Sequence, residues 1–153
     1  MTTVRRGTLR DLPALLEIMD VWAEETKGSA NFPVDKGCCA EMLVSHLLNE
    51  NAVLLVSEVP EKRVVGMICA TRMPAALDWS QVGLVQSMWY VLPEYRTIGS
   101  GPELLSDLEK IAKESGGAFV KVGANHGFDA ERVGAFYERS GYVPYETHYI
   151  KRL

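Results

Sequence analysis

The sequence predicts a single α+β domain over residues 1–153. The chain has 153 residues, which is the size of one domain. Hydrophobic residues make up 47% of the chain and charged residues 24%, the balance of a soluble globular protein with a sizeable core. Helix and strand patterns alternate in the order strand, two helices, three strands, helix, strand, helix and a final extended segment, which is typical of the α+β class.

The N-terminal part is expected to form a strand and then a helix. Residues 4–8 have the pattern of a short strand. A helix follows from Asp11, with Pro13 in its first turn, and runs to about Glu25. Its apolar face repeats at helical spacing and consists of Leu12, Leu15, Leu16, Met19 and Trp22.

A loop and a second helix come next. Residues 28–33 contain Gly, Ser, Asn and Pro, a composition typical of loops. Asp35 is suited to cap a helix whose apolar face carries Met42, Leu43, His46 and Leu47. A lone histidine on such a face is more often a packed, hydrogen-bonded residue than a ligand, so we leave His46 out of the predicted site.

Three strands are expected in the middle of the chain. Residues 52–59 and 63–71 are apolar, β-branched runs separated by a Pro-Glu-Lys turn, which predicts an antiparallel hairpin. Residues 73–80 have the composition of a loop. A third long strand is expected over residues 82–92, and it ends before Pro93, which cannot donate a hydrogen bond to a neighbouring strand.

The C-terminal part is expected to alternate helix and strand. Residues 100–115 carry one apolar stripe and one charged face, which predicts a helix ended by Gly116 and Gly117. Residues 118–124 are expected to form a strand and residues 129–140 another helix. A last extended segment begins at Gly141.

Charge and composition exclude several functional classes. The net charge of −4 and the lack of a basic cluster argue against nucleic acid as a partner. No apolar run marks a signal peptide or a membrane span, so we expect a cytoplasmic protein. The three cysteines, Cys38, Cys39 and Cys69, lack metal-ligand spacing, and we interpret them as reduced thiols instead of a disulfide or a nucleophile.

The stretch from Trp89 to Pro102 carries the clearest functional signal. It reads as a strand, a turn with Gly99 and Gly101, and the start of a helix. Glycines let backbone N–H groups approach a phosphate, and the unpaired amides and positive dipole end of the next helix favour negative charge. The stretch therefore predicts an anion-binding turn.

This run resembles motif A of the GCN5-related N-acetyltransferase (GNAT) superfamily. Arg96, Gly99 and Gly101 match its pattern, and residues 91–95 resemble the approach to it from the fourth strand. Residues 135–142 resemble the family's later segment of helix, tyrosine, glycine and aromatic residue. The resemblance implies the acyl-CoA N-acyltransferase fold, a mixed, mostly antiparallel sheet flanked by helices.

Other interpretations of the glycine turn fit less well. A dinucleotide fingerprint needs Gly or Ala where Leu104 stands, and a P-loop needs Gly-Lys followed by Ser or Thr. A plain strand-to-helix turn without a ligand remains an alternative.

The resemblance implies that acetyl-CoA, the acetyl thioester of coenzyme A, is the co-substrate. It implies no metal. The backbone of Val91 would pair with the pantetheine arm, and a backbone N–H at the splayed end of the third long strand would polarise the thioester carbonyl. The cofactor-binding residues expected from it are Val91, Arg96, Thr97, Ile98, Gly99, Ser100 and Gly101.

Tyr137 is the general acid that the resemblance implies, because a phenol can give a proton to the departing thiolate; a purely packing role is the alternative. Many relatives carry a glutamate base on the fourth strand, but this chain has Gln86 and Ser87 there, so a base would act through water held by these residues. Three other carboxylates are better explained as solvated surface groups: Glu25, Asp78 and Glu94.

The activity implied is transfer of an acetyl or short acyl group to a primary amine of a small molecule or peptide. A homodimer is left open. One alternative is an acyl-CoA-binding sensor or regulatory module without catalysis; another is an unrelated α+β interaction protein.

Overall fold

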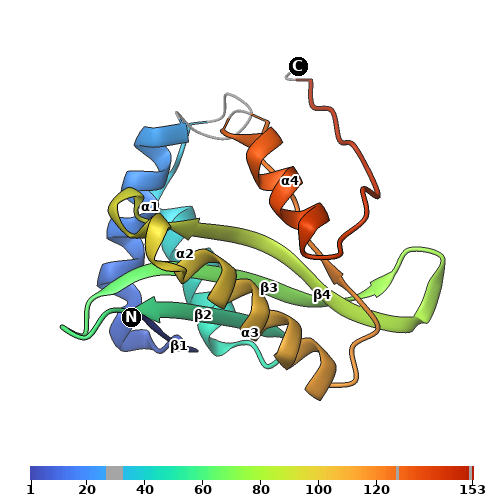
Figure 1. Cartoon of the computed structure of the whole chain (residues 1–153), viewed down its shortest axis with the longest axis horizontal. Coiled ribbons are helices and arrows are strands. Elements are labelled where there is room, and N and C mark those ends of the chain that lie inside the picture. Colours follow the sequence, from blue (N-terminus) through green and yellow to red (C-terminus); the bar gives the residue numbers. More distant parts are fainter. Residues whose placement is uncertain (27–32, 127, 152) are drawn as a thin grey trace.

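The computed structural model describes residues 1–26, 33–126, 128–151 and 153. Its centre is a five-stranded sheet in the order β1-β2-β3-β4-β5 (Figure 1). Neighbouring strands are antiparallel except for β4 and β5, which are parallel. The sheet is therefore mixed and mostly antiparallel, as predicted. Its strands are β1 (Thr3–Arg6), β2 (Ala52–Glu58), β3 (Val64–Ala75), β4 (Asp78–Val91) and β5 (Val120–Lys121).

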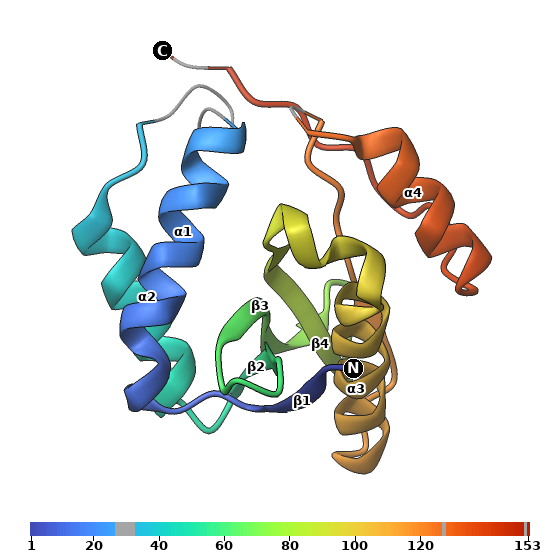
Figure 2. The ribbon, with the colours of Figure 1, turned by 60° about the vertical axis from the view of Figure 1, so that its left-hand side comes forward.

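Helices cover both faces of the sheet. Figure 2 shows α1 and α2 on one side and α3 and α4 on the other. Two short 3-10 helices, η1 (Leu9–Asp11) and η2 (Pro93–Ile98), precede α1 and α3. The α-helices are α1 (Leu12–Thr26), α2 (Lys36–Leu48), α3 (Ser100–Glu114) and α4 (Ala130–Arg139).

The core consists of two layers because side chains alternate along each strand. Met67 packs with Leu15 under α1 and α2. The next residue, Ile68, packs with Leu104 under α3. β3 is buried on both faces over its first residues, which explains its continuous apolar sequence.

Several predicted elements are confirmed. The first two long strands pair in register from Ala52–Thr71 to Glu58–Val64 and form the expected hairpin. The side chain of Asp35 accepts a hydrogen bond of 2.8 Å from the Cys38 amide and so caps α2. The helices near residues 12–25, 100–115 and 129–140 are also present.

The prediction of a loop over residues 73–80 is wrong, because β3 continues to Ala75 and β4 begins at Asp78. Pro74 is tolerated because the pairing register shifts between Pro74 and Ala75, where the ladder is irregular. The predicted loop over residues 28–33 falls largely outside the described residues.

Two C-terminal strands also differ from expectation. The strand expected over residues 118–124 shrinks to Val120–Lys121, because the chain and β4 diverge after Lys121. Before the strand, the Ala118 amide still donates to the Val82 carbonyl of β4 at 2.7 Å. The extended segment after Gly141 forms no strand in the residues that the structure describes up to 151. Its apolar side chains after Tyr142, among them Val143 and Tyr149, are exposed.

The contact between β4 and β5 depends on Gly83. A Cβ at this position would lie 2.6 Å from carbon atoms of the Phe119 ring, closer than real Cβ contacts come. We expect Gly83→Ala to lower the free energy of unfolding by about 1–3 kcal/mol, through overpacking. Urea denaturation measures this change.

Gly134→Ala is the matched control, because a Cβ there meets nothing within 4 Å. It lies inside α4, where alanine stabilises a helix by about 0.5–1 kcal/mol relative to glycine. Equal effects of the two substitutions would contradict the tight β4–β5 contact.

Candidate acyl-transfer site

The parallel strands β4 and β5 separate almost as soon as they meet. They pair only at Leu84–Val120 and Val85–Lys121. Beyond these two pairs, the Gly123 amide donates a hydrogen bond of 3.0 Å to the side-chain oxygen of Gln86 instead of to a backbone carbonyl of β4. In the described part of the chain, the later residues of β4 therefore have a strand partner only on the β3 side. We call this divergence the β4–β5 fork.

Tyr137 of α4 lies at the β4–β5 fork and contacts both of its sides. Its hydroxyl donates to the Gly123 carbonyl at 3.0 Å and lies 3.5 Å from the Gln86 side-chain oxygen. The ring packs against Trp89, with ring centroids 5.6 Å apart. Burial raises the pKa of Tyr137, so the hydroxyl keeps its proton at neutral pH.

The glycine turn leads from η2 into α3. Gly99 has φ of 95°, in the left-handed region that glycine adopts without strain. The first intrahelical bond runs from the Glu103 amide to the Gly99 carbonyl, at 3.1 Å. The amides of Ser100 and Gly101 come before that bond and are unpaired within the helix, as at any helix N-terminus.

Gly101 is needed for packing. It is buried, and a Cβ at this position would lie 3.3 Å from the Trp89 ring. Two buried polar atoms adjoin this contact, Ser100 Oγ and Trp89 Nε1, and neither has a hydrogen-bond partner among the described residues. Because buried polar atoms are usually hydrogen-bonded, these two are groups left over at the start of α3.

Arg96 holds the turn against the rest of the fold. Its Nε donates to the Val91 carbonyl at 3.0 Å, and its two terminal nitrogens bind the carboxylate of Glu25 from the end of α1. The guanidinium also stacks on Tyr90 and Phe128, 5.1 Å and 5.2 Å from the ring centres. Three of its five N–H donors are thus used inside the protein.

The surface role expected of Glu25 is wrong. Besides Arg96, its carboxylate accepts a hydrogen bond from Tyr90, and its side chain is 26% exposed. The hydrogen bonds from Arg96, above all, lower the pKa of Glu25 and keep it ionised. Asp78 and Glu94 are exposed; Asp78 accepts hydrogen bonds from Ser80, and Glu94 lies 4.0 Å from Arg63.

The structure separates the two polar residues of β4. The pairing of β3 with β4 shifts between Cys69 and Ala70, whose partners are Met88 and Gln86, so Ser87 is the extra residue of a β-bulge. Gln86 points to Tyr137, whereas Ser87 points to α2, where its Oγ lies 3.0 Å from Nε2 of His46. Sequence reasoning left His46 out because its spacing predicts a core position.

The predicted cofactor residues form one continuous stretch around the turn. Val91, Ser100 and Gly101 are buried, whereas Thr97 and Ile98 are exposed. Leu92 donates its amide to the Val65 carbonyl of β3, at 2.9 Å. Since successive residues of a strand point their amides to opposite sides, the Val91 amide faces the open edge of β4.

A model of the Acetyltransferase (GNAT) family matches residues 13–142, which include the turn, the fork and Tyr137. The chain belongs to the GNAT family. A search of curated proteins finds no match.

Solved structures show that the GNAT fold extends over the whole chain. A transcriptional regulator from Bacillus halodurans has a TM-score of 0.80 at 20% identity and covers 100% of both chains. Ribosomal-protein-alanine N-acetyltransferase from Brucella melitensis has a TM-score of 0.77 at 18% identity, covering 100% of this chain and 99% of the other. An acetyltransferase from Clostridium acetobutylicum with acetyl-CoA has a TM-score of 0.77 at 15% identity, covering 99% and 96%. At these identities the likeness concerns the fold.

Other features lie apart from the GNAT motif. Burial raises the pKa of Cys69 to about 12, so it remains a thiol, and Cys38 and Cys39 are also free. Within residues 1–26, 33–126, 128–151 and 153, no cluster of three or more His, Cys, Asp or Glu could hold a metal. No helix in the same residues has the length and hydropathy to cross a membrane.

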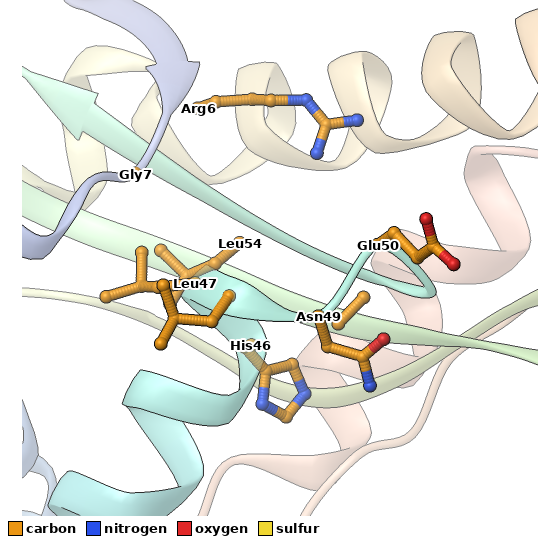
Figure 3. Close-up of a pocket in the computed structure, with 9 residues that line it drawn as sticks. Arg6, Gly7, His46, Leu47, Asn49, Glu50 and Leu54 are labelled. Atoms are coloured by element: carbon orange, nitrogen blue, oxygen red, sulfur yellow. The ribbon is translucent and has the colours of Figure 1, made fainter.

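A cavity of about 240 Å³ lies between the end of α2 and the start of β2 (Figure 3). Its lining includes Gly7, His46, Leu47, Asn49 and Leu54 and none of the residues of the turn. The cavity is therefore separate from the predicted cofactor site.

We expect the Glu25–Arg96 pair to contribute to stability. Glu25→Gln removes charge-assisted hydrogen bonds from a partly exposed pair and should cost about 1–2 kcal/mol at neutral pH. Because the pKa of Glu25 is lowered by folding, its contribution is present above the pKa of the unfolded chain and is lost as pH falls. The difference from wild type should shrink in acid, as followed by urea denaturation.

Asp20→Asn is the matched control on the same helix. Asp20 pairs with Lys36, but their side chains are 54% and 79% exposed, and such pairs contribute little. An equal loss of stability from both substitutions would mean that the Arg96 contacts have no special role.

Proposed function

We propose that this GNAT protein transfers an acetyl or short acyl group from acyl-CoA to the primary amine of a small molecule or peptide. The observation that carries the proposal is the left-handed turn at Gly99, which opens α3 beside the unpaired edge of β4. Acyl-CoA supplies an acyl group activated as a thioester, and the residues of this chain bind and orient it.

The turn fits a diphosphate. The backbone amides of residues 97–101 would hold its oxygens, and the dipole of α3 adds positive potential. Gly99 keeps the approach free of a side chain, and the unpartnered hydroxyl of Ser100 lies next to these amides. One negative group is close, Glu103, but it accepts a hydrogen bond from Thr2 at the start of the chain.

The open edge of β4 fits the pantetheine arm, which carries amide groups. The amide of Val91 faces this edge. The arm would bind as an added strand in the β4–β5 fork. It would thereby direct the thioester toward the bulge at Ser87, where backbone N–H groups of β4 could polarise its carbonyl.

Arg96 is assigned a positioning role. Its guanidinium is occupied by Glu25 and the Val91 carbonyl, so it shapes the turn and leaves phosphate binding to backbone amides.

Tyr137 is assigned as the acid that protonates the departing thiolate. It sits at the fork with its proton in place, and Gln86 lies beside its hydroxyl. Gln86 thus links β4 to Gly123 and Tyr137, which leaves Ser87 as the polar residue of this part of β4 for the role of base.

The acceptor is proposed as an amine because acylation needs a nucleophile. The structural relative from Brucella melitensis is named as an N-acetyltransferase of a ribosomal protein's alanine. The net charge of −4 suits a cationic amine. The three free thiols fit a reducing compartment, and we propose that the reaction takes place in the cytoplasm.

A second candidate function is an acyl-CoA sensor without catalysis. It is favoured by one observation: residues 86–88 of β4 carry no carboxylate to act as base. A thermal shift by acetyl-CoA combined with thiol release on a panel of primary amines separates the two. A shift with thiol release supports the enzyme, a shift alone supports the sensor, and no shift rejects both.

Replacement of Gly99 tests the turn. Gly99→Val places a branched side chain in a left-handed conformation at the proposed diphosphate, and we expect CoA affinity to fall by at least about 100-fold in calorimetric titration. Gly116→Val is the matched control, because Gly116 has φ of 72° at the other end of α3. It should lower stability comparably and leave CoA affinity unchanged; equal losses of affinity would reject the assignment.

Removal of one hydroxyl tests the acid. Tyr137→Phe should lower kcat by about 100-fold while the Kd for acetyl-CoA stays nearly constant. Tyr142→Phe serves as control, since Tyr142 packs on Tyr137 and donates to Glu109 at 2.8 Å but lies outside the proposed chemistry. If Tyr137→Phe turns over as fast as Tyr142→Phe, Tyr137 is only a packing residue.

A further inference from the structure

His46 and Ser87 form a hydrogen-bonded pair on the α2 side of the sheet. Nε2 of His46 lies 3.0 Å from Ser87 Oγ and 3.4 Å from Thr71 Oγ1. The pair joins α2 to the bulge of β4, one residue from Gln86. It brings a histidine, the side chain that most often takes a proton in catalysis, to a strand without a carboxylate base.

The other ring nitrogen fixes the state of the imidazole. Nδ1 of His46 lies 2.8 Å from the Met42 carbonyl, one turn earlier in α2. A carbonyl can only accept, so Nδ1 carries the proton and Nε2 of the neutral ring presents its lone pair. The ring is thus oriented to accept a proton from the hydroxyl of Ser87.

Ser87 can reach a substrate. Its side chain is exposed although the neighbouring strand positions are partly buried, because the bulge turns it out of the ladder. Its Oγ also lies 3.3 Å from the Cys69 carbonyl, which is the alternative acceptor of its single proton. An amine that approaches the fork from the α2 side meets this hydroxyl.

We propose that His46 is the terminal proton acceptor of the transfer reaction and acts through Ser87. The inference rests on the proposed function and supplies its missing base. An alkylammonium substrate gives one N–H proton to Ser87 Oγ, while the hydroxyl proton of Ser87 moves to Nε2 of His46. Ser87 is unchanged, the amine gains a free lone pair for attack on the acyl carbon, and His46 becomes an imidazolium.

The surroundings permit this charge. Nδ1–H of the imidazolium keeps its acceptor, the Met42 carbonyl. His46 borders the cavity of Figure 3, which brings the half-buried ring close to solvent, where the proton is finally released. Arg6 and Glu50 are the charged residues that line this cavity, and Figure 3 shows neither pointing at the imidazole.

The tautomer is the first test and does not depend on turnover. Long-range ¹H–¹⁵N spectra of the full chain, recorded where the ring is neutral, should show His46 protonated at Nδ1. A ring protonated at Nε2 could not accept from Ser87 and would overturn the relay.

Kinetics give the second test, with acetyl-CoA and the best amine of the panel. His46→Gln and Ser87→Ala should each lower kcat by about 100-fold with the Kd for acetyl-CoA unchanged, and the double variant should lose no more than either alone. In wild type, kcat/KM should rise with pH as the imidazole and the amine lose protons; in His46→Gln only the ionisation of the amine should remain. Thr71→Val removes the more distant hydroxyl and should keep the wild-type rate.

The outcomes separate the two proposals. If wild type turns over and His46→Gln keeps its rate and pH profile, the relay is wrong and the acyltransferase stands. Additive losses in the double variant would mean that the residues act separately, which also overturns the relay. If wild type binds acetyl-CoA but transfers to no amine, the proposed function fails and the relay fails with it.

Discussion

The guanidinium of Arg96 is the junction on which the candidate site depends. It joins the end of α1 through Glu25, the end of β4 through the Val91 carbonyl, and its own turn before α3. The aromatic rings of Tyr90 and Phe128 stack against it and add cation–π contacts. With these contacts made, Gly99 adopts the left-handed conformation from which α3 begins.

The sheet then divides the chemistry between its two faces. The β4–β5 fork opens beside the turn, and the consecutive side chains of Gln86 and Ser87 point to opposite faces of the sheet. Gln86 serves the face of α4, with Tyr137, and Ser87 serves the face of α2, with His46. The acid and the proton acceptor that we propose would therefore lie on opposite faces of the sheet.

Local patterns predicted most of the fold. The hairpin of β2 and β3, the Asp35 cap and the stripe of α3 each depend on neighbouring residues, and all are present. The errors lie where distant partners decide: β4 gains residues because β3 pairs with them, and β5 loses residues because β4 diverges.

The same limit applies to the site. The glycine turn is visible in the sequence because its residues are contiguous. By contrast, Glu25 and Arg96 lie on separate elements, as do His46 and Ser87, and only the sheet brings each pair together. Local periodicity could not distinguish Glu25 from a solvated surface carboxylate, or His46 from a packed core histidine.

The most direct test of the central claim is an amide titration of the ¹⁵N-labelled chain with coenzyme A and, separately, with pantetheine. The backbone resonances of Gly99, Ser100 and Gly101 should move strongly with coenzyme A and hardly at all with pantetheine, which lacks the diphosphate. Movement confined to other parts of the chain, or equal movement with both compounds, would show that the turn before α3 does not hold the diphosphate.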